Sequence, residues 1–189
     1  MTQLPAGVVL YGPPATGKDT ITKALIRIDG RYALFQRFKV GNGKTAGYRM
    51  GSGQELANLE AAGGVIYSNS RYGNTYVVDA PGLDSMLAAG LTPVLHLGQI
   101  EGVRAVVETY PAQWTTVLLW CTQEETAARS AGRGDSDTEA RIAAWQATQA
   151  DVDAHPDQVW DLTVTTGAYS PDAAARLVDQ RVRQALPAA

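Results

Sequence analysis

Residues 7–20 constrain the fold of this chain more than any other stretch. An apolar run at residues 7–11 leads into Gly12-Pro13-Pro14-Ala15-Thr16-Gly17-Lys18, and apolar residues at helical spacing follow at residues 21–26. This order predicts a strand, a glycine-rich loop and a helix. The backbone N–H groups of such a loop and the helix N-terminus form a cradle for anions, to which the Lys18 side chain adds a positive charge. The polyphosphate of a nucleoside triphosphate is therefore the expected ligand.

The residue after Lys18 is Asp19, at a position where serine or threonine normally reaches Mg²⁺. We expect Asp19 or its neighbour Thr20 to contact Mg²⁺, directly or through water, because carboxylate and hydroxyl oxygens are hard ligands. An acid in the first turn of a helix is also favoured by the helix dipole alone. A glycine- and proline-rich turn between a core strand and a core helix is the alternative for the whole loop.

Composition bounds the class of protein. With 189 residues and 45% hydrophobic content, the chain is long enough for one compact domain, residues 1–189, with room for a small inserted lobe. It has no run of 18 apolar residues and no secretory signal, so we expect a cytoplasmic protein that does not bind a membrane. The net charge of −3 argues against nucleic acid as a partner. A monomer and a homodimer both remain open.

The second half of the chain alternates between apolar runs and helical patterns. Strands are expected at residues 93–97, 115–120 and 160–165, and helices at residues 81–89, 99–109, 122–130, 137–152 and 171–184. Thr122 and Glu125 have the spacing of a capping box. Together with the first strand and helix, these βα units predict a parallel sheet flanked by helices on both faces, an α/β fold of three layers. Ligands of such sheets bind at the carboxyl ends of the strands, where the glycine-rich loop also lies.

Residues 31–79 interrupt this alternation and predict a small inserted α/β lobe. A short strand is expected within residues 32–39, a helix at 54–62, and two further strands at 65–68 and 75–78. Six lysines and arginines lie between residues 27 and 49, against a single acid, Asp29. This charge predicts a surface that binds a small anion, although a solvated basic surface with ordinary strand aromatics has the same composition.

With these features in place, the chain resembles the guanylate kinase family of nucleoside monophosphate kinases over most of its length. The resemblance rests on the glycine-rich loop, on the tyrosine-containing turn Gly73-Asn74-Thr75-Tyr76 and on Arg133-Gly134 before a long helix. It implies a P-loop NTPase fold with a core at residues 1–30 and 80–189 and a short lid at about residues 129–141. It also implies transfer of the γ-phosphoryl group of ATP, with Mg²⁺, to the phosphate of a small phosphorylated acceptor.

The resemblance assigns residues to roles as well. Arg37 corresponds to a phosphate-binding arginine of the acceptor lobe, and Tyr48 and Tyr76 correspond to its two tyrosines. Arg129 and Arg133 correspond to lid arginines, although a cation near a helix C-terminus is also favoured by the dipole. The expected site comprises Gly12, Ala15, Thr16, Gly17, Lys18, Asp19 and Thr20 for ATP, Asp19 or Thr20 for the metal, Lys18, Arg129 and Arg133 for catalysis, and Arg37, Lys39, Tyr48, Tyr67, Tyr76 and His96 for the acceptor.

The chain departs from the family where guanine is recognised. The family uses a glutamate, a serine and an aspartate, and the corresponding places here hold Tyr67, Val78 and His96 or Gly98. None of these accepts hydrogen bonds from a guanine amino group as a carboxylate does, which argues against GMP as the acceptor. A third lid arginine has no counterpart either, because Trp145 falls near its place, with Arg141 one turn earlier as a substitute.

Other interpretations remain open. Gly17-Lys18-Asp19-Thr20 resembles the loop of the bacterial ribose 1,5-bisphosphate phosphokinases, which makes that sugar phosphate the alternative acceptor. A non-catalytic nucleotide-binding or scaffold module of the same fold is a second alternative, against which the intact glycines and lysine of the loop argue. A GTPase-type switch is a third, since Asp79-Ala80-Pro81-Gly82 matches Asp-x-x-Gly, but the sequence has no Asn/Thr-Lys-x-Asp motif downstream.

Overall fold

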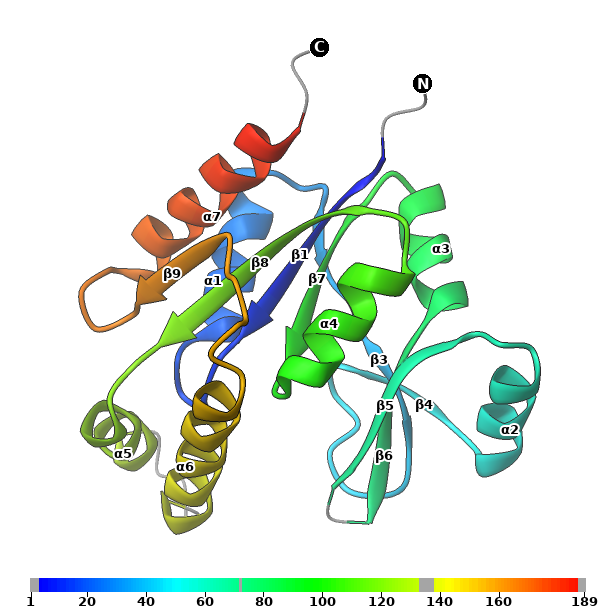
Figure 1. Ribbon diagram of the computed structural model, residues 1–189, viewed down its shortest axis with the longest axis horizontal. Helices are drawn as coiled ribbons and strands as arrows, with labels where there is room; N and C mark the ends of the chain where they lie inside the picture. The colour runs from blue at the N-terminus through cyan, green and yellow to red at the C-terminus, as the bar shows by residue number, and fades with distance from the viewer. Residues whose placement is uncertain (1–3, 72, 133–137, 187–189) are drawn as a thin grey trace.

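The main sheet consists of five parallel strands. The computed structural model describes residues 4–71, 73–132 and 138–186. The sheet has the order β2 (Tyr32–Leu34), β7 (Thr92–Leu97), β1 (Ala6–Tyr11), β8 (Gln113–Trp120) and β9 (Leu162–Thr165) (Figure 1). All neighbouring strands run in the same direction. The parallel α/β sheet expected from the sequence is confirmed, and its central strand is the one that leads into the glycine-rich loop.

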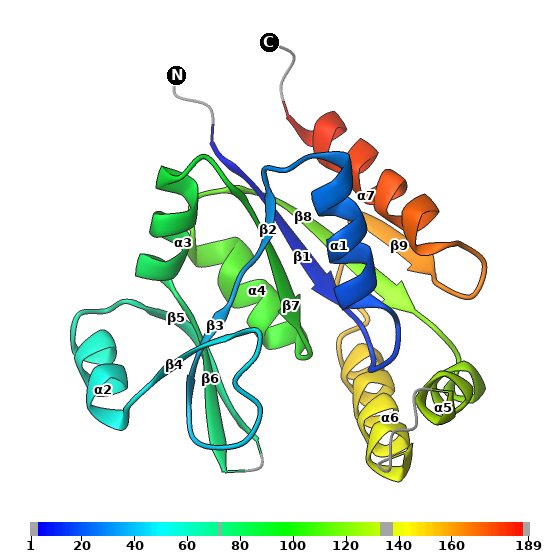
Figure 2. The same cartoon turned by 180° about the vertical axis from the view of Figure 1, so that it is seen from behind.

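Helices cover both faces of this sheet. One face carries α1 (Lys18–Ile28) and α7 (Pro171–Ala185), and the other carries α3 (Ala80–Ala88) and α4 (Ile100–Thr109) (Figures 1 and 2). The alternation along β1 explains the two layers, because Val8 and Leu10 pack with α1 and α7, whereas Val9 and Tyr11 pack with α3 and α4. All four of these side chains are fully buried. The three-layer arrangement is therefore confirmed.

Two further helices lie beyond the carboxyl ends of the strands. They are α5 (Gln123–Ala131) and α6 (Thr138–Ala154), which pack against each other (Figure 1). The predicted capping box is present at the start of α5, where Thr122 accepts from the Glu125 N–H and Glu125 accepts from the Thr122 N–H. Trp145 of α6 donates its ring N–H to the Cys121 carbonyl at 2.8 Å and lies against Trp120, so it fastens α6 to the end of β8.

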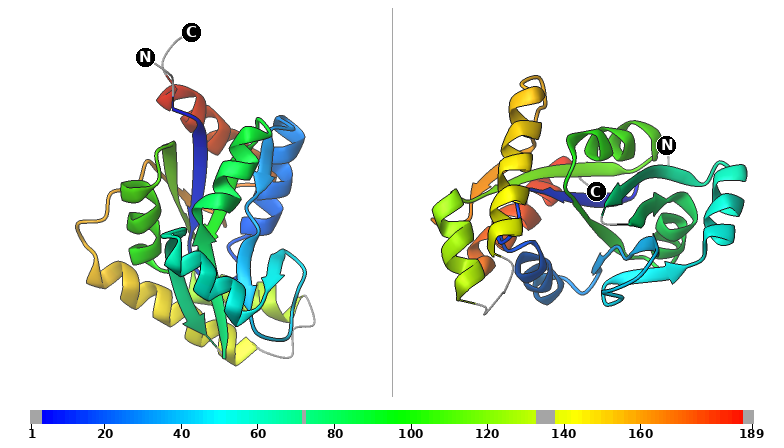
Figure 3. Two further views of the ribbon diagram at one scale, coloured as in Figure 1. Left: turned by 90° about the vertical axis from the view of Figure 1, so that its right-hand side faces the viewer. Right: turned by 90° about the horizontal axis from the view of Figure 1, so that it is seen from below.

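The inserted lobe is built on a second sheet of four strands. Its order is β4 (Tyr48–Gly51), β3 (Arg37–Val40), β6 (Asn74–Asp79) and β5 (Val65–Arg71), with α2 (Gly53–Ala61) between β4 and β5. Viewed from below, the lobe lies on one side of the main sheet and α5 and α6 lie on the other (Figure 3). The carboxyl ends of the main strands, with the glycine-rich loop, lie between these two flanks.

The boundary of the lobe differs from the expectation. The single strand expected within residues 32–39 is two strands, of which β2 belongs to the main sheet and β3 to the lobe. The reason is the burial of Phe35, which is only 3% exposed, packs in the core under α3 and α4, and donates its N–H to the Val94 carbonyl of β7 at 2.9 Å. The lobe therefore begins at Arg37 and not at residue 31.

Among the described residues, no helix is long and apolar enough to cross a lipid bilayer.

Candidate active site

The loop between β1 and α1 is held in one backbone conformation. Gly12 has φ +151°, and a side chain there would place its Cβ 2.0 Å from the Leu119 carbonyl oxygen of the neighbouring strand β8. Ala15 and Gly17 have φ values of 63° and 86°, in the left-handed region. A non-glycine residue in that region costs about 1–2 kcal/mol, so the surrounding structure must hold Ala15 in place.

The loop leaves the N-terminus of α1 open. Four other helices have a side-chain cap, namely α2, α3, α5 and α7, which are capped by Ser52, Asp79, Thr122 and Ser170. At α1 the N-cap residue is Gly17, and no side-chain hydrogen bond caps this helix among the described residues. Its first N–H groups therefore have no acceptor from an N-cap side chain, which is the arrangement that an anion cradle requires.

Lys18 folds back over this loop. Its ammonium group donates to the carbonyls of Gly12 and Pro13 at 2.7 and 2.9 Å, and to the Thr16 hydroxyl at 3.3 Å. Burial lowers the Lys18 pKa to about 8, partly opposed by the charge of Asp19. Since the three acceptors are neutral oxygens, they orient the ammonium group without cancelling its charge.

Arg129 of α5 connects the loop to the far edge of the sheet. Its guanidinium donates to the Ala15 carbonyl at 3.0 Å, and to the hydroxyl and carbonyl of Thr166 at 3.0 and 3.2 Å. A cavity of about 280 Å³ opens beside it, lined also by Thr20 and Tyr169. The expected position of Arg129 next to the loop thus matches the structure, whereas Arg133 lies outside the described residues.

A second cavity, of about 340 Å³, lies on the other side of the loop. It is lined by Asp19, Thr20, His96 and Arg141, among others. Asp19 projects into solvent with 79% of its side chain exposed, and its Oδ1 lies 3.5 Å from Nδ1 of His96. Arg141, considered from the sequence as a substitute for a lid arginine, reaches this cavity from α6, whereas Trp145 does not line it.

His96 lies where the main sheet meets the loop. Its Nε2 is 2.8 Å from the Thr22 hydroxyl of α1. Burial, together with the positive charges of Lys18 and Arg37, lowers the His96 pKa to about 4, so the ring is neutral at pH 7. One of these cations follows the glycine-rich loop and the other belongs to the lobe, so the charges of both predicted phosphate sites act on His96.

The acceptor residues predicted on the lobe form one cluster. The strand register sets Arg37 opposite Tyr48 and Lys39 opposite Tyr76. The two tyrosine rings are 5.3 Å apart, and the Arg37 guanidinium lies 5.1 Å from the Tyr76 ring centre. Lys39 is 2% exposed, and its ammonium group donates to the carbonyls of Asn42 and Lys44 at 2.6 and 2.8 Å. The four side chains combine two cations with two phenol groups, which suits a phosphate ester.

Tyr67 is not part of this cluster. Its ring is buried at the junction of lobe and main domain, where it packs against Gly102 of α4 and its hydroxyl lies 3.4 Å from Gln99 Oε1. Asp79, the first residue of the Asp-x-x-Gly match, caps α3 and forms an ion pair with Arg49. It lies on β6 of the lobe, whereas the neighbours of β1 are β7 and β8, so the GTPase-type interpretation finds no support.

Two polar residues of the site were missed from the sequence. Thr22 and Thr166 bind His96 and Arg129, their partners being 74 and 37 positions away. The i, i+4 spacing of Lys18 and Thr22 on one helix face was the only available signal for the first, and no pattern marks the second.

Comparison with known proteins supports the fold. Neither a family model nor a curated protein matches the chain. Among solved structures, guanylate kinase from Anaplasma phagocytophilum is similar, with a TM-score of 0.65 and 15% identity over 100% of this chain and 89% of that one. Shikimate kinase from Acinetobacter baumannii, in complex with shikimate, is similar with a TM-score of 0.52 and 14% identity over 95% and 94% of the two chains. The chain therefore has the P-loop NTPase fold that these two kinases share.

Proposed function

We propose that this protein is an ATP-dependent kinase that transfers the γ-phosphoryl group to the phosphate of a small phosphorylated acceptor, in the first place a nucleoside monophosphate. The observation that carries the proposal is a pair of cationic sites whose charges both act on His96. One is the glycine-rich loop with Lys18, and the other is the lobe cluster with Arg37. Phosphoryl transfer depends mainly on positioning and on neutralising charge, and two cationic sites near one side chain would serve both.

The donor nucleotide would bind along the loop. The N–H groups of residues 15–19 and the Lys18 ammonium would hold its β- and γ-phosphates, and the cavity between Arg129 and Tyr169 would take the nucleoside. Mg²⁺ fits beside Asp19 and Thr20, whose oxygens are exposed at the rim of the loop cavity, and it would neutralise phosphate charge. Arg129, together with Arg133, would stabilise the charge that moves between the phosphates.

The acceptor would be held by its phosphate on Arg37, Lys39, Tyr48 and Tyr76. Its other end would face a cavity of about 410 Å³ between the lobe and α6, lined by Gly98, Gln99, Asp151 and several alanines. Both oxygens of the Asp151 carboxylate have partners there, since Oδ2 accepts from the Tyr11 hydroxyl and the Ile100 N–H at 2.7 and 2.8 Å, and Oδ1 lies 3.3 Å from Nδ1 of His155. A head group that needs no free carboxylate, unlike guanine, is therefore favoured. Ribose 1,5-bisphosphate is the second candidate on the same ground.

A panel of acceptors tests the substrate class. ATP is incubated with each common nucleoside and deoxynucleoside monophosphate and with ribose 1,5-bisphosphate, and products are followed by ³¹P NMR. We expect turnover of at least one non-guanine nucleotide above that of GMP. Preferred turnover of GMP would contradict the argument from the engaged carboxylate, and turnover of ribose 1,5-bisphosphate alone would replace the nucleotide by the sugar phosphate.

A matched pair of lysine variants tests the kinase against the non-catalytic alternative. Lys18→Ala is expected to weaken ATP binding about 10- to 100-fold, because a hydrogen bond to a charged group contributes about 1.5–3 kcal/mol. Lys23→Ala, on the exposed side of the same helix, should leave the ATP affinity unchanged. Calorimetric titration measures both. Equal affinities would mean that the loop does not hold the phosphates and would sink the proposal.

A further inference from the structure

The side chains of His96 and Asp19 place two electron-pair donors close together. His96 comes from β7 of the main sheet, and Asp19 from the first turn of α1. Nδ1 of the histidine is 3.5 Å from Oδ1 of the aspartate, at the wall of the loop cavity. The sequence alone placed His96 with the acceptor, and the geometry points to a different partner.

The surroundings of Thr22 are compatible with a proton on Nε2 of His96. The Thr22 hydroxyl oxygen lies 2.8 Å from the Lys18 carbonyl and 2.8 Å from Nε2 of His96. When the hydroxyl donates its hydrogen to the carbonyl, its oxygen accepts from Nε2–H, and the lone pair of Nδ1 then faces the Asp19 carboxylate. Two acceptors that face each other without a hydrogen between them repel, unless a cation lies between them.

The separation of the two atoms fits a shared ion. Ligand atoms that each lie about 2.1 Å from one divalent cation are at most about 4.2 Å apart, and the observed 3.5 Å is within this limit. The cavity leaves room for further ligands, because Thr20 lines it and the phosphate-binding N–H groups border it. Histidine ligands of metals commonly have the other ring N–H fixed by a hydrogen bond, as the Thr22 hydroxyl does here.

We propose that Nδ1 of His96 and Oδ1 of Asp19 jointly bind the divalent cation that accompanies the nucleotide, and that the nitrogen ligand makes Mn²⁺ the preferred ion over Mg²⁺. In P-loop NTPases a loop serine or threonine and an aspartate from a strand hold Mg²⁺. Here the carboxylate is in the first turn of α1 and an imidazole is on the strand. Imidazole favours first-row transition metals, whereas an all-oxygen set suits Mg²⁺. This inference rests on the proposed binding of a polyphosphate at the loop.

The histidine content of the chain permits a direct test. The protein has two histidines, His96 and His155. Protein labelled with ¹⁵N only in histidine is mixed with Mn²⁺ and inorganic tripolyphosphate, which contains no nitrogen, and is measured by pulsed electron paramagnetic resonance. We expect the coupling of a directly bound ¹⁵N nucleus in the unaltered protein and in His155→Gln, and its loss in His96→Gln. Calorimetry should show a Mn²⁺ affinity at least about tenfold lower in His96→Gln.

The contrary outcomes separate this inference from the proposed function. If Mn²⁺ binds with tripolyphosphate but no ¹⁵N coupling is seen, or if the unaltered protein prefers Mg²⁺, the histidine ligand is wrong and the phosphate site stands. If tripolyphosphate does not bind at all, the proposed function fails as well. Should His96→Gln not fold, Asp19→Asn serves instead, because that side chain is largely exposed. It should lower the Mn²⁺ affinity, and an unchanged affinity would overturn the shared site.

Discussion

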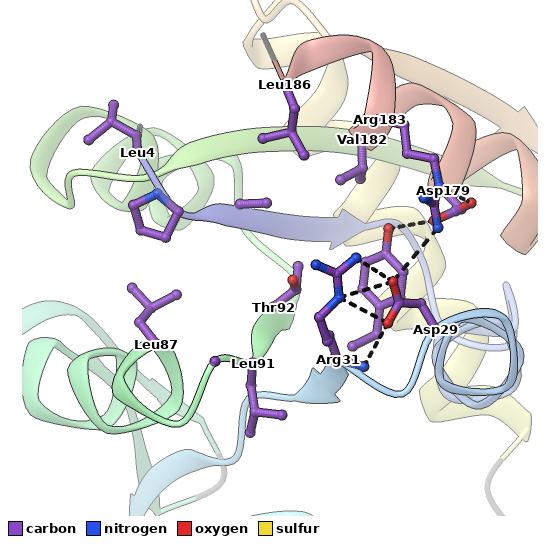
Figure 4. A pocket seen from close by; sticks show the side chains of 14 residues that line it. Leu4, Asp29, Arg31, Leu87, Leu91, Thr92, Asp179, Val182, Arg183 and Leu186 are labelled. Carbon is purple, nitrogen blue, oxygen red and sulfur yellow. Dashed lines mark hydrogen bonds and ion pairs between the residues drawn. The ribbon is translucent and has the colours of Figure 1, made fainter. Parts of the chain in front are cut away.

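The cationic side chains at the two ends of the main sheet have different kinds of partner. At the amino end, a cavity of about 330 Å³ is lined by Asp29, Arg31, Asp179 and Arg183 (Figure 4). Each of these cations meets a carboxylate: Arg31 lies 2.7 Å from Asp29, and Arg183 lies 2.8 Å from Asp179 and 3.7 Å from Asp29. At the carboxyl end, Lys18 and Lys39 donate to backbone carbonyls.

The difference teaches which cations are available to a ligand. A guanidinium that is paired with a carboxylate contributes little net potential, and its pairing already satisfies both groups. Carbonyl oxygens carry no net charge, so an ammonium group held by them in its protonated form can attract an anion into the site. This contrast supports the proposal that phosphate binds at the carboxyl end of the sheet and not in the cavity at the amino end.

A glycine-to-alanine substitution at each end of the sheet should give the largest difference in stability. Gly12→Ala places a Cβ 2.0 Å from a backbone carbonyl at a strained φ, and we expect the free energy of unfolding to fall by about 3–5 kcal/mol. Gly30→Ala, near the amino end, meets no atom within 4 Å, and should change it by less than about 0.5 kcal/mol. Urea denaturation measures both. Similar losses would show that the loop backbone is not specially constrained.

Replacing one arginine from each region should distinguish a cation that binds the acceptor from a cation that only stabilises the fold. Arg37→Ala is expected to raise the KM for the acceptor about tenfold or more, since a hydrogen bond to a charged phosphate contributes about 1.5–3 kcal/mol. Arg183→Ala should leave KM unchanged and cost at most about 1 kcal/mol of stability, because the Arg183 side chain is 57% exposed. Steady-state kinetics measure KM, and thermal unfolding measures the stability. If Arg183→Ala raised KM as much, the distinction between the carboxylate-paired cations of the amino end and the cations of the proposed site would fail.

The smallest effect concerns acid stability at the amino end. Hydrogen bonds from Arg31 lower the pKa of Asp29 from 3.8 to about 2. The folded protein therefore binds this proton less readily than the unfolded chain does, so the stabilisation is complete above about pH 4 and is lost as the pH falls towards about 2. In Arg31→Ala the pKa of Asp29 should return towards 3.8, and this part of the acid dependence should shrink. Denaturation at pH 2.5 and pH 5 measures it, and an unchanged difference would exclude Arg31 as the cause.

Local patterns in the sequence predicted much of the fold. The strand, loop and helix at residues 7–28 and the capping box at Thr122 depend on residues a few positions apart, so their spacing alone identifies them. The parallel sheet followed from alternating strands and helices. The lobe cluster was predicted through resemblance, and the structure brings Arg37, Lys39, Tyr48 and Tyr76 together.

What the sequence did not predict depends on distant partners. The division between β2 and β3 arises because Phe35 bonds to Val94, on a strand that is far along the chain. The hydrogen bond of His96 depends on Thr22, and the burial of Tyr67 depends on the absence of a side chain at Gly102. Hydrophobic periodicity cannot predict such contacts, because neither residue of the pair carries a signal in its own segment that identifies its partner.

The contact between Tyr67 and Gly102 has a consequence for engineering. A Cβ at position 102 would lie 2.6 Å from the tyrosine ring, so the lobe and α4 fit each other only as a matched pair. Tyr67 and Val78 of the lobe also share a core with Leu83 and Ile100 of the main domain. A lobe transplanted from another protein of this fold would therefore require the matching first turn of α4 from the same protein.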